Sequence, residues 1–146
     1  MMMRVDEMKR EDALKARDWL TARIRKNTGR PELEFPADWL PETGLSVFGR
    51  ESGSDHEERL LAVATLYLEK SSPVAVCGWC IGDPVNTARE SDMAVRLVLG
   101  AMPNYARVHG ARHLLTMFGS RGINRICDEL GYASGDTEVE HKYMIL

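Results

Sequence analysis

The spacing of apolar residues changes several times along this chain, and the order of those changes is what most constrains its fold. Between residues 45 and 81, three stretches rich in β-forming residues follow one another, separated by polar turns. Before and after them, apolar residues recur every three or four positions, as on one face of a helix. This order predicts an α/β (α+β) domain with a mixed, mostly antiparallel sheet and helices on both of its faces.

The pattern predicts nine elements. They are a strand at 4–8, a helix that starts at 11 and ends within 27–31, strands at 45–50, 60–69 and 74–81, a helix from 88 to 109, a strand at 114–118, a helix at 123–130 and a last strand at 141–146. Thr87 and Glu90 fit a capping box at the start of the second helix, because each side chain can bond the other residue's amide. Pro103 falls inside this helix and should kink it, since proline cannot donate a backbone hydrogen bond.

Length and composition set broad limits. The chain has 146 residues and no low-complexity linker, so we expect a single domain over residues 1–146. A formal net charge of −3 gives no general basic field, which argues against nucleic acid as a partner. No stretch reaches the roughly 20 apolar residues that span a bilayer, and three cysteines are an odd number for a disulfide framework. We therefore expect a cytoplasmic protein without a membrane partner.

Three segments in a fixed order carry a resemblance to a known superfamily. They are 74–84, which ends in Gly82-Asp83-Pro84, then 110–117 after a helix, then Leu130-Gly131-Tyr132 at the end of the next helix. In this order and spacing the chain resembles the GNAT acetyltransferases. The resemblance covers nearly the whole chain and implies a single GNAT-like domain that uses acetyl-CoA.

In that superfamily a loop of the form Arg/Gln-x-x-Gly-x-Gly/Ala holds the diphosphate of acetyl-CoA, because glycines let backbone amides approach the phosphates. The best match here runs from Arg89 to Ala94, and Asp92 stands in place of the central glycine. A carboxylate has the wrong sign beside a dianion, so the loop resembles a degraded one. The cofactor-binding residues that the resemblance implies are Arg89, Ser91, Asp92, Ala94, Trp79, Ile81 and Ser120.

The resemblance also implies a catalytic position on the late helix. The tyrosine that protonates the departing thiolate in many members corresponds to Cys127 here. A thiol has a lower pKa than a tyrosine and can donate a proton, so Cys127 is the candidate catalytic residue; the alternative is a small buried hydrophobe. The family's general base, commonly a glutamate, has no counterpart within 74–81, which leaves Glu69, Asp83 or a water.

Cys77 and Cys80 form a C-x-x-C motif, which is typical of redox sites at the start of a helix. Here the motif lies within a predicted strand. Residues three apart on a regular strand point to opposite faces, so the two thiols are not expected to meet. A zinc site would need Cys127 and a histidine to converge on them as well, and no metal site is predicted.

Three functions remain from the sequence, and the third of them is a purely structural component of an oligomer. The first is a GNAT-fold protein that binds another protein, similar to compact phage-encoded chains that modulate host enzymes in the host cytoplasm or belong to virions. The alternative is an active acetyl-CoA-dependent N-acetyltransferase acting on a protein or a small amine. An enzyme should show an open gap between 74–81 and 113–118. A binding module should show that gap filled and an exposed apolar patch, involving Trp39 or Met102. The oligomeric state stays open.

Overall fold

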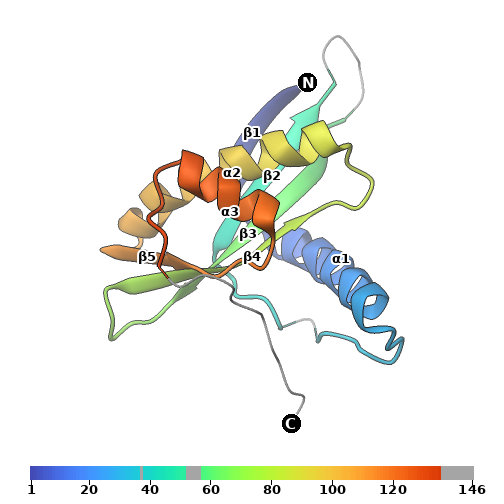
Figure 1. The fold of residues 1–146 in the computed structure, drawn as a ribbon, viewed down its shortest axis with the longest axis horizontal. Coiled ribbons are helices and arrows are strands. Elements are labelled where there is room, and N and C mark those ends of the chain that lie inside the picture. The colour runs from blue at the N-terminus through green and yellow to red at the C-terminus, as the bar shows by residue number, and fades with distance from the viewer. Residues whose placement is uncertain (37, 52–56, 136–146) are drawn as a thin grey trace.

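A computed structural model of the chain describes residues 1–36, 38–51 and 57–135 (Figure 1). Eight elements lie within them, close to their predicted ranges. They are β1 (Met2–Glu7), α1 (Arg10–Thr28), β2 (Gly44–Arg50), β3 (Arg59–Leu68), β4 (Val74–Gly82), α2 (Ala88–Val108), β5 (His113–Thr116) and α3 (Arg121–Glu129). The predicted last strand at 141–146 falls outside the described residues.

The five strands form one sheet in chain order, β1 to β5. The first four strands are antiparallel to their neighbours, whereas β5 runs parallel to β4. A parallel pair needs a long crossover, which α2 supplies between β4 and β5. The predicted mixed, mostly antiparallel sheet is confirmed.

Helices cover both faces of this sheet, as predicted (Figure 1). On one face, Leu20 of α1 packs in a buried cluster with Val63 of β3 and Ile81 of β4. On the other face, α2 and α3 contribute to a larger cluster, which includes Leu99 and Ile126. Full burial of one such side chain contributes roughly 1.5–3 kcal/mol, so these two clusters fix the positions of the helices on the sheet.

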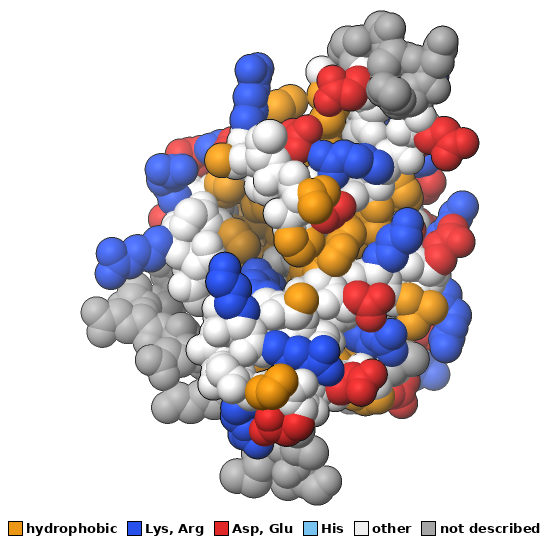
Figure 2. Space-filling model, turned by 90° about the vertical axis from the view of Figure 1, so that its right-hand side faces the viewer, with side chains coloured by type: hydrophobic (Ala, Val, Ile, Leu, Met, Phe, Trp, Pro, Cys, Tyr) orange, Lys and Arg blue, Asp and Glu red, His pale blue; other side chains and the backbone are white. Residues whose placement is uncertain are grey.

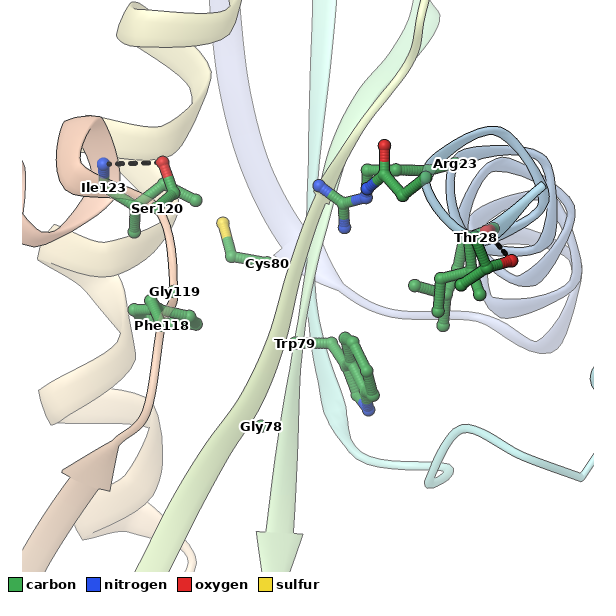
Figure 3. A pocket seen from close by; sticks show the side chains of 12 residues that line it. Arg23, Thr28, Gly78, Trp79, Cys80, Phe118, Gly119, Ser120 and Ile123 are labelled. Atoms are coloured by element: carbon green, nitrogen blue, oxygen red, sulfur yellow. Dashed lines mark hydrogen bonds between the residues drawn. The ribbon is translucent and has the colours of Figure 1, made fainter. Parts of the chain in front are cut away.

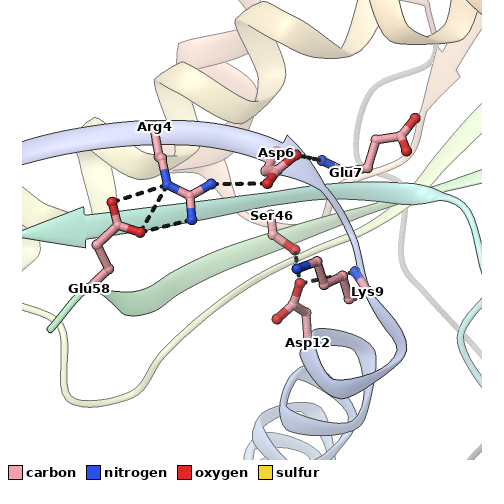
Figure 4. A network of polar contacts seen from close by, with 7 residues as sticks. All are labelled: Arg4, Asp6, Glu7, Lys9, Asp12, Ser46 and Glu58. Carbon is pink, nitrogen blue, oxygen red and sulfur yellow. Dashed lines mark hydrogen bonds and ion pairs between the residues drawn. The ribbon is translucent and has the colours of Figure 1, made fainter.

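Buried and exposed polar contacts hold the first strand and helix in place (Figure 4). The Asp12 carboxylate, which is only 4% exposed, accepts hydrogen bonds from the Lys9 amide at 3.0 Å and from the Ser46 hydroxyl at 2.9 Å. It thereby joins the first turn of α1 to β2. At the surface, Arg4 pairs with Glu58 at 2.8 Å. The two hydrogen bonds of Asp12 help to fix where α1 crosses the sheet, and α1 forms one wall of the site described below.

Helix α2 continues from Ala88 to Val108 through Pro103. Because Pro103 has no amide hydrogen, the Leu99 carbonyl one turn earlier loses its usual helical donor. The hydroxyl of Tyr132, which follows α3, donates to that carbonyl at 2.7 Å. The chain therefore compensates for the proline with a side chain from another element, which also ties α2 to the segment after α3.

We expect Tyr132→Phe to lower the free energy of unfolding by about 1 kcal/mol, because it leaves the Leu99 carbonyl without a donor. Chemical denaturation measures the change. The control is the same substitution in a Pro103→Ala background, where residue 103 again has an amide that can bond Leu99. An equal loss in both backgrounds would contradict the compensation.

A β-bulge corrects one prediction about the cysteines. Leu66 of β3 pairs with Cys77 and Ala64 pairs with Cys80, so a step of two residues on β3 faces a step of three on β4. The extra residue returns Cys80 to the same face as Cys77, and both lie in the cluster beneath α2 and α3. The prediction that the two thiols face opposite sides was wrong, because it assumed a regular strand.

Candidate functional site

The two parallel strands β4 and β5 pair over a short length and then part. Their register runs from Val74 opposite His113 to Cys77 opposite Thr116. Beyond that point β4 continues to Gly82, whereas the chain after β5 enters α3. A cavity of about 310 Å³ lies where the strands part. The gap that the sequence analysis expected of an enzyme is therefore open.

The cavity is lined from three directions (Figure 3). Helix α1 contributes Leu20, Arg23, Ile24, Asn27 and Thr28; β4 contributes Gly78, Trp79 and Cys80; the segment from β5 into α3 contributes Phe118, Gly119, Ser120 and Ile123. Since α1 and α3 lie on opposite faces of the sheet, the cavity reaches the gap between the strands from both faces.

Two local features shape this cavity. On β4, the amide of Trp79 within the bulge donates to the Thr65 hydroxyl at 3.1 Å, and Thr65 is fully buried. On the opposite wall, the Ser120 hydroxyl caps α3 by accepting from the Ile123 amide at 3.3 Å. The first turn of α3 thus faces the cavity with its positive dipole end, which favours negative charge there.

The charged groups in the lining of the cavity set its electrostatic character. Among the described residues that line it, Arg23 is the only charged one, and none is a carboxylate or a histidine. Elsewhere on the surface, charges of both signs alternate without a large basic area on the face drawn in Figure 2. The cavity therefore has a local positive character that the net charge of −3 does not suggest.

The predicted site residues do not all meet at this cavity. Trp79 and Ser120 line it. Ile81 is buried on the α1 face of the sheet, and Cys127 is 4% exposed in the cluster beneath α2. Cys127 is not among the lining residues, so the described cavity does not bring the thiol to its surface.

The stretch that matched the diphosphate loop forms the first two turns of α2 and is not a loop. Ala94 is fully buried against the sheet. Asp92 pairs with Arg96 at 2.8 Å one turn later, and Ser91 directly precedes Asp92 in the helix. Arg89 lines a second hollow, beside Met93 and the N-terminal methionines. The residues that match the diphosphate loop in sequence therefore lie inside the helix, after the turn that precedes α2.

The carboxylate of Glu90 holds the turn before α2 in place. The predicted capping box is confirmed: Glu90 accepts from the Thr87 amide at 2.8 Å, and its amide donates to Thr87. Arg59 donates to Glu90 at 2.8 Å. The Thr87 amide, followed by Arg59, holds the pKa of Glu90 below its ordinary value, so this carboxylate is charged at neutral pH. Within the described residues, the amides of Ala88 and Arg89 keep no partner.

All three cysteines are reduced and buried. Burial raises the pKa of the Cys80 thiol to about 12, raises that of Cys77 well above its usual value, and also raises that of Cys127. Since the thiolate is the reactive form, none of these thiols is activated at neutral pH. No group of three or more metal-binding side chains lies together among the described residues.

We expect the folded protein to resist alkylation by iodoacetamide at pH 7.5, whereas the unfolded protein should take up three equivalents, as counted by mass spectrometry. The raised pKa values also imply that stability is full below the unfolded thiol pKa of about 8.5 and falls as pH rises beyond it. Rapid alkylation of Cys127 in the folded protein would restore it as a catalytic candidate.

Sequence reasoning missed the contribution of α1. The signal on that helix was Arg23, a cation next to the apolar stripe of Leu20 and Ile24. Gly119 directly before the N-cap Ser120 was a second signal, since a glycine there leaves space in front of a helix N-terminus. Neither signal points to a site until α1 is placed across the sheet from α3.

Comparison with known proteins adds the fold's name. No family model and no curated protein matches the chain. Among solved structures, it is similar to a probable acetyltransferase, with 15% identity, 98% of each chain covered and a TM-score of 0.64. The fold is that of the GNAT acetyltransferases. An aminoglycoside acetyltransferase from an uncultured soil metagenomic sample, in complex with sisomicin, aligns over 99% of this chain and 96% of its own at 8% identity (TM-score 0.55).

A further GNAT-fold structure is the aminoglycoside acetyltransferase AAC(6')-Iy in complex with the bisubstrate analog CoA-S-monomethyl-acetylneamine. It aligns over 99% of this chain and 100% of its own, with 12% identity and a TM-score of 0.54. At these identities the likeness shows the fold. In the described part of the chain, no helix is long and apolar enough to cross a membrane.

Proposed function

We propose that this protein is an acetyl-CoA-dependent N-acetyltransferase whose site is the cavity between β4 and β5. The observation that carries the proposal is the open gap after Cys77, lined by the Gly78–Cys80 bulge on one side and by Gly119 and Ser120 on the other. The exposed patch expected of a pure binding module is absent at both named residues in the described structure. Met102 is fully buried and Trp39 packs against the α1 cluster.

The residues of the gap suit an extended amide-containing chain such as the pantetheine arm. Strand β4 has no strand partner on its β5 side beyond Cys77 within the described residues, so its backbone groups face the gap. Acetyl-CoA supplies an activated thioester. Ser120, whose oxygen accepts from Ile123, still has its hydroxyl hydrogen to donate to a departing thiolate, and the first turn of α3 stabilises negative charge nearby.

No general base lies in the described lining of the cavity. In the transfer, the amine nitrogen bonds the acetyl carbon, the carbon–sulfur bond breaks, and the amine proton goes to water. Correct positioning supplies much of the rate enhancement in such a reaction. The rate at fixed amine concentration is therefore expected to rise with pH up to the pKa of the acceptor amine itself.

The start of α2 is less well suited to bind the diphosphate of acetyl-CoA. The amides of Ala88 and Arg89 are available at the start of α2, but the charged carboxylate of Glu90 stands beside them. This feature favours a second candidate function, a GNAT-fold protein that has lost its cofactor and binds another protein, as in the phage-type interpretation. The two candidates differ in one measurable property, the affinity for acetyl-CoA.

The test is calorimetric titration with acetyl-CoA and with acetyl-pantetheine, which lacks the diphosphate. We expect both to bind the unmodified protein. Glu90→Gln should strengthen binding of acetyl-CoA by about fivefold, because one like charge is removed next to the diphosphate. The same substitution should leave acetyl-pantetheine unchanged.

Asp92→Asn is the matched control. Asp92 is paired with Arg96 one turn into α2, so its neutralisation should change the affinity for acetyl-CoA by less than about twofold. If neither the unmodified protein nor Glu90→Gln binds either compound, the acetyltransferase proposal fails and the protein-binding candidate replaces it.

A further inference from the structure

Arg23 lies at the wall of the cavity. Among the residues that the structure describes, it forms no hydrogen bond and no ion pair, although it lies within a chain that has 22 acidic residues. Figure 3 shows its guanidinium extending from α1 toward β4 and Cys80. Its charge also acts on Cys80, where it opposes the larger effect of burial on the pKa of the thiol.

Arg23 is exposed to solvent, and its neighbours one turn away on α1 offer it no opposite charge. The residues one turn before and after it on α1 are Trp19, Leu20, Lys26 and Asn27, none of them acidic. Across the cavity, the N-terminal turn of α3 adds a second positive end capped by Ser120. Two positive groups of different origin thus face one space that holds no described carboxylate.

An arginine is the side chain best suited to bind a carboxylate, because its planar fork can form two parallel hydrogen bonds. A polycationic acceptor, by contrast, needs carboxylates in the site. Sisomicin, the ligand of one GNAT-fold structure above, is such a polycation.

We propose that the acceptor of this site is a small amine that carries a carboxylate, with Arg23 binding the carboxylate and the amine directed to the gap between β4 and β5. The inference rests on the proposed acetyltransferase function, since it names the substrate class of the same cavity. Arg23 is a binding and specificity residue in this arrangement, and it takes no part in proton transfer.

The test uses pairs of amines that differ by a single carboxylate: lysine against cadaverine, and ornithine against putrescine, with sisomicin as the polycation. Binding is measured by calorimetry with and without CoA, and turnover by release of free thiol from acetyl-CoA. We expect lysine and ornithine to bind about tenfold more tightly than their decarboxylated partners, the effect of one charge-assisted contact. In Arg23→Gln that ratio should fall to about one.

Lys26→Gln is the matched control, because Lys26 is an exposed cation on the same helix that does not line the cavity. It should leave the ratio unchanged. Equal or tighter binding of cadaverine or sisomicin, or a ratio that survives in Arg23→Gln, would overturn the inference. Acetyl transfer to cadaverine as fast as to lysine would contradict the role of the carboxylate and would support the acetyltransferase function. If no free thiol is released from acetyl-CoA, the proposed acetyltransferase function is contradicted. The ratio of the two affinities measured without CoA would then still decide whether Arg23 binds a carboxylate.

Discussion

Replacing Gly119 by phenylalanine should weaken acetyl-CoA binding about a hundredfold and leave the fold intact. Gly119 lines the cavity directly before the N-cap of α3. A side chain at this position would meet no atom within 4 Å, and the backbone there is not in the left-handed region that only glycine tolerates well. A phenyl ring can therefore enter the cavity without disturbing its walls, and the space needed by the thioester arm is lost.

The measurement combines calorimetric titration with thermal unfolding of the same sample. Gly135→Phe provides the matched control, since Gly135 is likewise free of neighbours within 4 Å and lies outside the cavity. It should keep both the affinity and the melting temperature of the unmodified protein. Unchanged affinity in Gly119→Phe would mean that acetyl-CoA binds elsewhere, and the cavity would lose its proposed role.

The order of elements could be read from the sequence because each depends on local signals. The capping box at Thr87 and Glu90 and the termination of α1 at Gly29, which adopts a left-handed φ of 66°, need only neighbouring residues. The apolar period of α2 likewise reports which side of the helix is buried. Such signals fixed the helices and strands to within a few residues at their ends.

The errors arose where a distant residue decides the local structure. Thr65 on β3 stabilises the bulge that turns Cys80 to the face of Cys77, and no signal within β4 announces that extra residue. The cavity itself combines α1 with the start of α3, which are about a hundred residues apart in the chain. A pattern within one segment cannot indicate such a meeting.

The position of the diphosphate loop shows the same limitation in another form. A short pattern of arginine and small residues was matched at 89–94, yet the hydrogen bonds of α2 already use the amides from Glu90 onward. Free amides occur only at the first positions of a helix. The capping box at Thr87 was therefore the better guide to where an anion can approach the chain than the spacing of Arg89 and Ala94.

Thr65→Val should lower the free energy of unfolding by about 2 kcal/mol, although valine has nearly the same shape as threonine. The substitution removes the hydroxyl oxygen that accepts from the Trp79 amide, at a side chain that is fully buried. Denaturant titration measures the loss. Because the bulge positions Gly78 and Cys80 in the cavity wall, affinity for acetyl-pantetheine should also fall several-fold under conditions where the variant remains folded.

Thr65→Ser separates the hydrogen bond from the packing. Serine keeps the oxygen that accepts from Trp79 and loses only a methyl group, at a cost of about 1 kcal/mol for the small cavity left behind. We therefore expect the serine variant to retain the affinity for acetyl-pantetheine that the valine variant loses. If both variants bind equally well, the bulge does not need the threonine hydroxyl, because the amide of Trp79 then finds another acceptor. If both lose affinity, packing of the methyl group, and not the hydrogen bond, holds the wall of the site in place.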